Sequence, residues 1–137
     1  MKQVDELIRG EMAAVQSIDA VLSRIKNDME RTELTSIRQD HVRAVDRLKR
    51  YAGADFKNET TSSGPWGAFA SAFTGGASLF GDKAAVQALR VGEEYGIKEY
   101  REALEDDSMN FELKEVIRSE LLPNQERHIS TIERYIH

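Results

Sequence analysis

The chain has 137 residues, of which 40% are hydrophobic and 31% charged, with no cysteine and a formal net charge of −5. This length and composition fit one folded domain, 1–137, and exclude a disordered chain, disulfide bonds, thiolate metal sites and cysteine catalysis. The acidic balance disfavours nucleic-acid binding, and no apolar run is long enough for membrane insertion.

Helical periodicity marks the first part of the chain. Apolar residues recur from Val4 in alternating steps of four and three, which predicts a helix over about residues 3–28. Thr32 offers a capping hydroxyl for a second helix, which we expect to stop at Gly53. The sequence therefore predicts a helical hairpin that turns at about residues 29–31.

The middle of the chain has a different composition. Residues 53–64 are rich in Ser, Thr and Gly and predict a loop, whereas residues 65–74 predict a short helix that begins at Pro65. Three aromatic side chains share one face of this short helix, and we expect them to contact a second copy of the chain or a partner protein: Trp66, Phe69 and Phe73.

Two further helices are expected in the last part of the chain. Asp82 is positioned to cap the first of them, which runs to about Asp106 before a tight turn. The last helix covers about residues 111–136. Pro123 lies inside it and should kink or interrupt it.

Each predicted long helix carries polar residues on its apolar stripe. These are Glu11 in the first, His41 in the second, Glu93 in the third, and Gln125 with His128 in the fourth. A buried carboxylate or imidazole destabilises a fold unless it is paired, hydrogen-bonded or bound to metal. Ionisable residues projecting inward from facing helices are typical of a ferritin-like metal centre.

The expected turn of the first hairpin decides which residues share a level. A turn at about residues 29–31 places His41 opposite Asp19 and Gln16, while Glu11 lies more than one helical turn away from His41. We therefore expect Glu11 to extend toward solvent or to pair with a neighbour such as Arg47.

Folding the second hairpin places Glu93 and Glu94 near Gln125, with His128 about one turn off. The polar residues of the two hairpins share a level only if the second and third helices start at the same end of the bundle. The segment that connects these helices must then span the length of the bundle, roughly 30 Å for helices of ~20 residues. Two short-looped hairpins joined by one long crossover have ferritin-like connectivity. We predict an all-α, ferritin-like four-helix bundle with a short extra helix in its long crossover.

The ligand pattern of a di-iron centre is incomplete in this chain. Such a centre uses two Glu-x-x-His pairs, but Arg38 precedes His41 and Gln125 precedes His128. We therefore expect no cofactor beyond at most one weakly held divalent metal ion. The candidate ligands are Asp19, His41, Glu93, Glu94 and His128. The alternative is a structural polar layer that also contains Gln16, Arg38 and Gln125.

Short motifs accompany these polar positions. They are Ser63-Gly64-Pro65-Trp66, Ala72-Phe73-Thr74-Gly75-Gly76, Asp82-Lys83-Ala84, Gly92-Glu93-Glu94, Tyr100-x-x-Ala103-Leu104 and His128-x-x-x-Ile132. From about Leu7 to Ile136 the chain resembles a bacterial domain family of unknown function within the ferritin-like superfamily. It departs from that family in lacking a His-Arg pair in the short helix and in a longer loop after Phe73. The resemblance implies a four-helix bundle that can form a dimer, with an incomplete or absent metal site, and no established activity.

Three functions follow from these observations. The first is a non-enzymatic oligomer, with a dimer favoured, that acts through a partner protein, for example in stress or envelope physiology. The second is a weak binder of iron, manganese or zinc with residual redox or storage activity. The third is a di-iron oxidase that recruits further ligands such as Glu11. We expect the first, in the bacterial cytoplasm.

Overall fold

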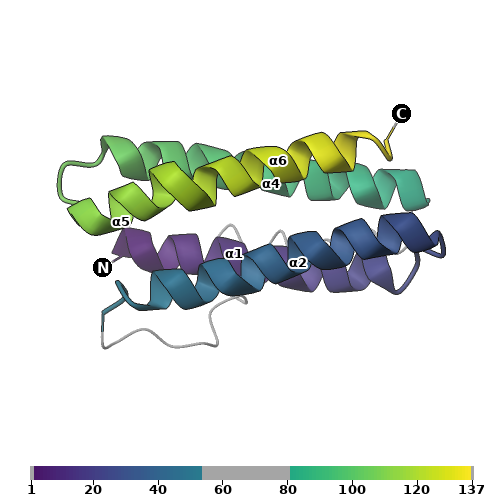
Figure 1. Cartoon of the computed structure of the whole chain (residues 1–137), viewed down its shortest axis with the longest axis horizontal. Helices are drawn as coiled ribbons and strands as arrows, with labels where there is room; N and C mark the ends of the chain where they lie inside the picture. Colours follow the sequence, from purple (N-terminus) through teal and green to yellow (C-terminus); the bar gives the residue numbers. More distant parts are fainter. Residues whose placement is uncertain (1, 54–80, 137) are drawn as a thin grey trace.

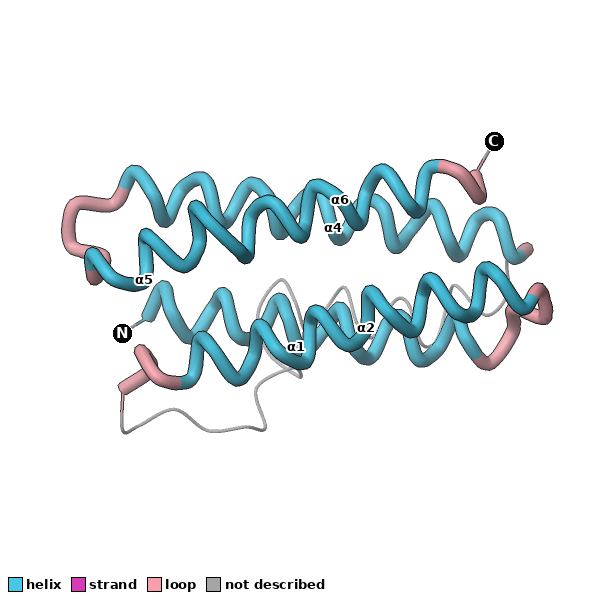
Figure 2. Tube along the Cα trace, viewed as in Figure 1, coloured by secondary structure: helices cyan, strands magenta, loops and turns pink. Residues whose placement is uncertain are grey.

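The computed structural model describes residues 2–53 and 81–136 of the chain. Four long helical segments form two hairpins that lie side by side (Figures 1 and 2). Both described ranges are helical apart from their turns and contain no strand, which confirms the all-α prediction. The expected short helix, with Trp66, Phe69 and Phe73, lies outside the described residues.

The first hairpin consists of α1 (Lys2–Leu22) and α2 (Asp28–Lys49). Its turn comes earlier than expected, because Asn27 caps α2 by accepting a hydrogen bond at 2.9 Å from the backbone N–H of Glu30. Thr32, predicted to be the cap, lies inside α2, where its hydroxyl donates to the carbonyl of Asp28. The prediction of a turn at residues 29–31 was wrong.

The second hairpin begins with α4 (Asp82–Glu105), whose N-cap is Gly81 rather than the expected Asp82. The returning segment is divided into α5 (Phe111–Val116), the π-helical segment η3 (Ile117–Leu121) and α6 (Leu122–Glu133). Figure 1 shows this segment as one nearly continuous rod.

Pro123 lies in the first turn of α6, directly after the π-helical segment. Proline lacks a backbone N–H, and its ring would collide with the carbonyl four residues earlier in a regular α-helix. The wider π turn relieves that conflict. The expected interruption therefore occurs as a local change of hydrogen-bonding pattern, and the chain continues as a helix.

The two hairpins are packed mainly through α1 against α4, with α2 also contacting α6. Figure 1 shows that α2 and α4 start at the same end of the bundle. The end of α2 and the start of α4 therefore lie at opposite ends of the bundle. This arrangement is the one that the sequence required for the polar residues of the two hairpins to lie at the same level. None of the described helices combines the length and the hydropathy needed to cross a bilayer.

Two apolar clusters fill the interior, one toward each end of the bundle. One consists of Val4, Leu7, Ile8, Ala44, Leu48, Tyr100, Ala103, Met109, Leu113, Ile117 and Leu121. The other consists of Ile18, Val21, Ile25, Leu34, Ile37, Ala85, Val86, Leu89 and Ile132. Buried polar residues occupy the levels between them along all four long helical segments: Glu11, His41, Glu93, Gln125 and His128.

Candidate metal centre

His41 lies at the centre of the buried polar layer, with 1% of its surface exposed. Its Nδ1 contacts a carboxylate oxygen of Glu11 from α1, and its Nε2 lies 2.7 Å from Oε1 of Glu93 from α4. The imidazole of one helix therefore joins carboxylates from two others. Both carboxylates are themselves only 4% exposed.

Hydrogen bonds at both ring nitrogens identify His41 as an imidazolium. A carboxylate can only accept, so both nitrogens must carry a proton when both carboxylates are ionised. Burial by itself would lower the pKa of His41, but the charges of Glu93 and Glu11 and their hydrogen bonds raise it well above its ordinary value. The ring therefore carries a positive charge between two negative ones.

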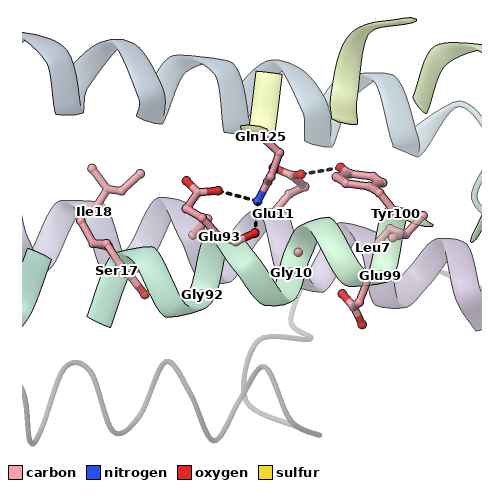
Figure 3. A pocket seen from close by; sticks show the side chains of 13 residues that line it. Leu7, Gly10, Glu11, Ser17, Ile18, Gly92, Glu93, Glu99, Tyr100 and Gln125 are labelled. Atoms are coloured by element: carbon pink, nitrogen blue, oxygen red, sulfur yellow. Dashed lines mark hydrogen bonds between the residues drawn. The ribbon is translucent and has the colours of Figure 1, made fainter. Parts of the chain in front are cut away.

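Glu93 is the residue on which the interactions of three helices converge. Its Oε1 accepts from His41, and the side-chain amide of Gln125 donates to its Oε2 (Figure 3). Burial by itself would raise its pKa, but the charge of His41, the nearby imidazole of His128 and the hydrogen bond from His41 lower it to about 2. Glu93 is therefore ionised at neutral pH despite its burial.

Tyr100 completes the environment of Glu11. It lies on the same face of α4 as Glu93, and its hydroxyl donates to Oε1 of Glu11, as Figure 3 shows. Burial raises the pKa of Tyr100 well above its ordinary value, and the charge of Glu11 raises it further. The phenol therefore stays protonated and fixes the orientation of the Glu11 carboxylate.

His128 on α6 has its two nitrogens in different surroundings. Its Nε2 lies 2.8 Å from Oδ2 of Asp40, which is 14% exposed. Burial opposes ionisation of Asp40, but the hydrogen bonds and charges of His128 and Arg43 lower its pKa. The Nδ1 of His128 has no hydrogen-bond partner among the described residues and lies 3.5 Å from Oε1 of Glu93.

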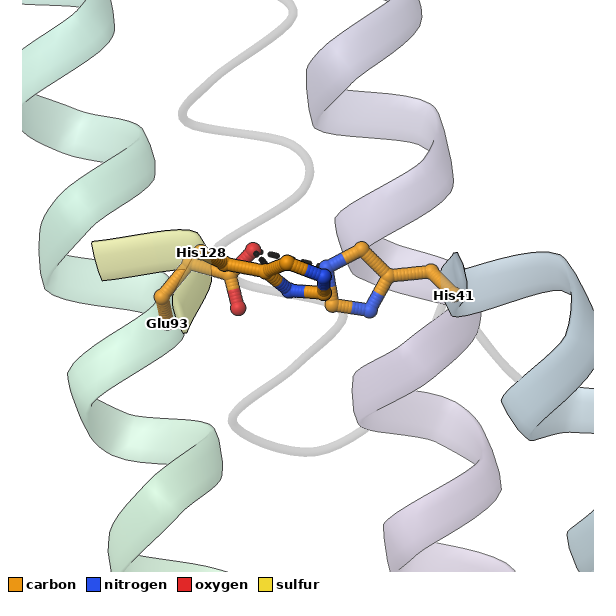
Figure 4. A group of neighbouring side chains, drawn as sticks. All are labelled: His41, Glu93 and His128. Atoms are coloured by element: carbon orange, nitrogen blue, oxygen red, sulfur yellow. Dashed lines mark hydrogen bonds and ion pairs between the residues drawn. The ribbon is translucent and has the colours of Figure 1, made fainter. Parts of the chain in front are cut away.

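The side chains of His41, Glu93 and His128 each direct one potential ligand atom toward the others, as Figure 4 shows. These atoms lie within 4.8 Å of one another, and the two imidazole rings are 4.8 Å apart between centroids. A tetrahedral ion with ligands at about 2.1 Å needs ligand atoms roughly 3.4 Å apart. Small side-chain movements would thus convert this group into a coordination site.

Two of the five predicted ligands lie elsewhere. Asp19 pairs with Arg38 at the surface, at 2.6 Å between Oδ1 and Nε. Glu94 is exposed and pairs with Arg90 on its own helix at 3.2 Å. Asp19 misses the level of His41 because the first hairpin turns earlier than expected, and Glu94 points to solvent because it lies one position away from the buried stripe.

The buried polar layer also contains other residues than those predicted. Gln125 is 5% exposed and belongs to it. Gln16 is exposed, and Arg38 forms its ion pair with a side chain that is 51% exposed, outside the core. Glu11 was expected to be near solvent or paired with Arg47, but it contacts His41, and Arg47 pairs instead with Glu120 at 3.0 Å.

Three further residues shape the site: Glu11, Asp40 and Tyr100. Glu11 and Tyr100 occupy positions on the apolar stripes of their helices, so the pattern contained the signal that both are buried. Asp40 lies beside that stripe and carries no comparable signal, because its contact depends on how α6 packs against α2.

Comparison of the chain with protein-family models, with curated proteins and with solved structures gives no match.

Proposed function

We propose that this protein binds one divalent transition-metal ion through Nε2 of His41, Oε1 of Glu93 and Nδ1 of His128. The observation that carries this proposal is the buried Nδ1 of His128, which faces Glu93 without a hydrogen bond to any described residue. Nε2 of His128 donates to Asp40, so when the ring carries one proton its lone pair is on Nδ1.

The residues behind the three ligands also support metal binding. A histidine that coordinates metal generally donates its other N–H to a carboxylate or carbonyl, which fixes the ring and makes it a better ligand. Glu11 has this relationship to His41, and Asp40 has it to His128. Gln125 in turn holds the second oxygen of Glu93.

Charge balance favours a dication over a proton at this position. Without metal, His41 provides one positive charge between the two buried carboxylates of Glu11 and Glu93. A divalent ion that displaces the Nε2 proton of His41 would neutralise both carboxylates. Two imidazoles and one carboxylate suit zinc, iron, cobalt or manganese better than magnesium or calcium.

Metal titration of tag-free protein tests the proposal. We expect one Zn²⁺ or Co²⁺ per chain by isothermal titration calorimetry. We expect His128→Ala and Glu93→Gln to abolish binding, and Asp40→Asn to weaken it about 10- to 100-fold through the orientation of His128. Asp19→Asn and Glu94→Gln are matched controls, because both remove a carboxylate outside the group, and they should leave the affinity unchanged.

A structural role for the polar layer is the second candidate. It is favoured by His41, whose two nitrogens both have carboxylate partners and need no metal to be satisfied. Such a layer fixes helix register, and the bundle would then act through oligomerisation or a partner protein. Failure of the unsubstituted protein to bind metal would favour this role, and sedimentation analysis would then show whether the chain forms a dimer.

The ferritin-like assignment is part of the same proposal. Its support is the common starting end of α2 and α4 (Figure 1). A second support is that all four long helical segments contribute buried polar residues to the interior. A single-ion site made of two histidines and one glutamate would be a reduced form of the usual two-metal arrangement.

A further inference from the structure

Three carboxylates gather where the N-terminal part of α1 lies beside the C-terminal part of α4. Glu6, Glu99 and Glu102 line a surface pocket of about 380 Å³, together with Gln3, Leu7 and Arg9. Arg9 pairs with Glu6 at 3.1 Å, so the carboxylates outnumber the cations. The pocket therefore has an electrostatic potential that attracts cations.

The pKa of Tyr95 responds to the same three carboxylates, while the ammonium of Lys98 lies 5.9 Å from the centroid of its ring. Burial is the largest cause of the raised pKa of Tyr95, and the charges of Glu99, Glu6 and Glu102 raise it further. All three carboxylates therefore act on the same region, although they come from two helices. A cation near the pocket would be attracted by them together.

A second, smaller cavity lies deeper between α1 and α4. Its volume is about 20 Å³, which is enough for a water molecule, and Glu11 and Glu93 form part of its wall (Figure 3). Gly10 and Gly92 are among the residues that line this space. Its wall also contains Ser17, which is 1% exposed and whose hydroxyl has no hydrogen-bond partner among the described residues. The cavity thus offers a polar occupant an unsatisfied buried group.

The two spaces have wall residues in common. Leu7 and Glu99 line both the surface pocket and the inner cavity. Glu99 lies six positions after Glu93 on α4, which corresponds to roughly 9 Å along the helix axis. Carboxylates thus follow one another from the surface to the proposed ligand Glu93, with Glu11 beside it.

The opposite approach to the site is less favourable for a cation. On that side His128 is covered by Asp40, which is itself paired with Arg43 and with Arg127 at 3.6 Å. Two guanidinium groups at this surface would repel a divalent ion. The charge distribution therefore favours access from the side of α1 and α4.

We propose that the acidic pocket and the inner cavity form the path by which a divalent metal ion reaches the buried site. In this role Glu99 and Glu102 attract the hydrated ion, and the cavity between α1 and α4 leads it to Glu93. This inference rests on the proposed metal binding and adds the route of uptake to it.

The rate of Co²⁺ binding, followed by stopped-flow absorbance, tests the path. We expect the double variant Glu99→Gln/Glu102→Gln to bind Co²⁺ about three- to tenfold more slowly at low ionic strength, and to reach the same stoichiometry at saturation. High salt should remove the difference, because it screens exposed charges. The matched control is Glu112→Gln/Glu115→Gln, which makes the same change in net charge on α5, away from both cavities.

The outcomes separate the path from the site. Equal association rates for the two double variants, with full binding in both, would overturn the path and leave the metal site intact. A lower stoichiometry in the Glu99/Glu102 variant would make these residues ligands and would also contradict the path. Absence of binding by the unsubstituted chain would overturn the proposed function, and the path with it.

Discussion

Gly96 on α4 lies directly against the side-chain amide of Gln125 on α6. A Cβ atom at position 96 would be 2.5 Å from Nε2 of Gln125, closer than two such atoms can approach. The same amide donates to Oε2 of Glu93. The absence of a side chain at position 96 therefore allows Gln125 to hold the carboxylate at the centre of the polar layer.

We predict that Gly96→Ala destabilises the protein by about 1 kcal/mol. Alanine is favoured over glycine in a helix by roughly 1 kcal/mol, but displacement of Gln125 leaves a buried carboxylate oxygen without its donor, at a cost of about 1–3 kcal/mol. Urea denaturation measures the difference. In a Gln125→Ala background the clash is absent, so the same Gly96→Ala change should become stabilising. The same sign in both backgrounds would contradict this account.

Tyr100→Phe should lower the free energy of unfolding by about 1–3 kcal/mol. The substitution removes only the hydroxyl that donates to Glu11 and so leaves a buried carboxylate oxygen unsatisfied. Tyr95→Phe removes the same hydroxyl from a residue that is 40% exposed, and it should change stability by less than about 0.5 kcal/mol. Equal effects at the two positions would show that the Tyr100–Glu11 hydrogen bond contributes little.

The charge of Glu93 should stabilise the fold above about pH 4.5 and lose this effect as the pH falls toward 2. Its folded pKa of about 2 lies below the ordinary 4.5, so the unfolded chain binds the proton more readily and acid favours unfolding. The shift corresponds to roughly 3 kcal/mol. In urea denaturation, the stability difference between the unsubstituted protein and Glu93→Gln should shrink over this range. A difference independent of pH would argue against an ionised Glu93.

His41 should behave in the opposite sense. Its folded pKa is raised, so its charge contributes fully below the ordinary value of 6.5, and the contribution is lost as the pH rises through the raised pKa. The NMR signal of its ring Cε1–H should therefore remain that of an imidazolium from about pH 5 to 8. A midpoint near 6.5 would show that the two carboxylates do not hold the proton.

Arg38→Gln should reduce stability by no more than about 1 kcal/mol, since surface ion pairs contribute little. Arg38 and Asp19 are 32% and 51% exposed in their side chains, which places their bond in contact with solvent. Thermal unfolding at low and at high salt measures the effect. A loss of several kcal/mol, unaffected by salt, would mean that Arg38 belongs to the core layer after all.

The sequence by itself determined the helical segments and most of the buried polar positions. Spacing by three and four residues is a local property, because one turn of helix brings such residues to the same face. It therefore indicated that His41, Glu93 and His128 point inward. The same pattern included Glu11 and Tyr100, but it did not indicate which residues they contact.

Only the tertiary structure decided which of these residues meet. A shift of the first turn by a few residues replaces Asp19 with Glu11 as the partner of His41, because the level of a residue depends on where the hairpin folds back. The cap at Asn27 sets that point. Asp40 reaches His128 through the packing of two helices that are far apart in the sequence. Periodicity fixes the face of a helix, whereas its height along its neighbours is fixed by turns and packing.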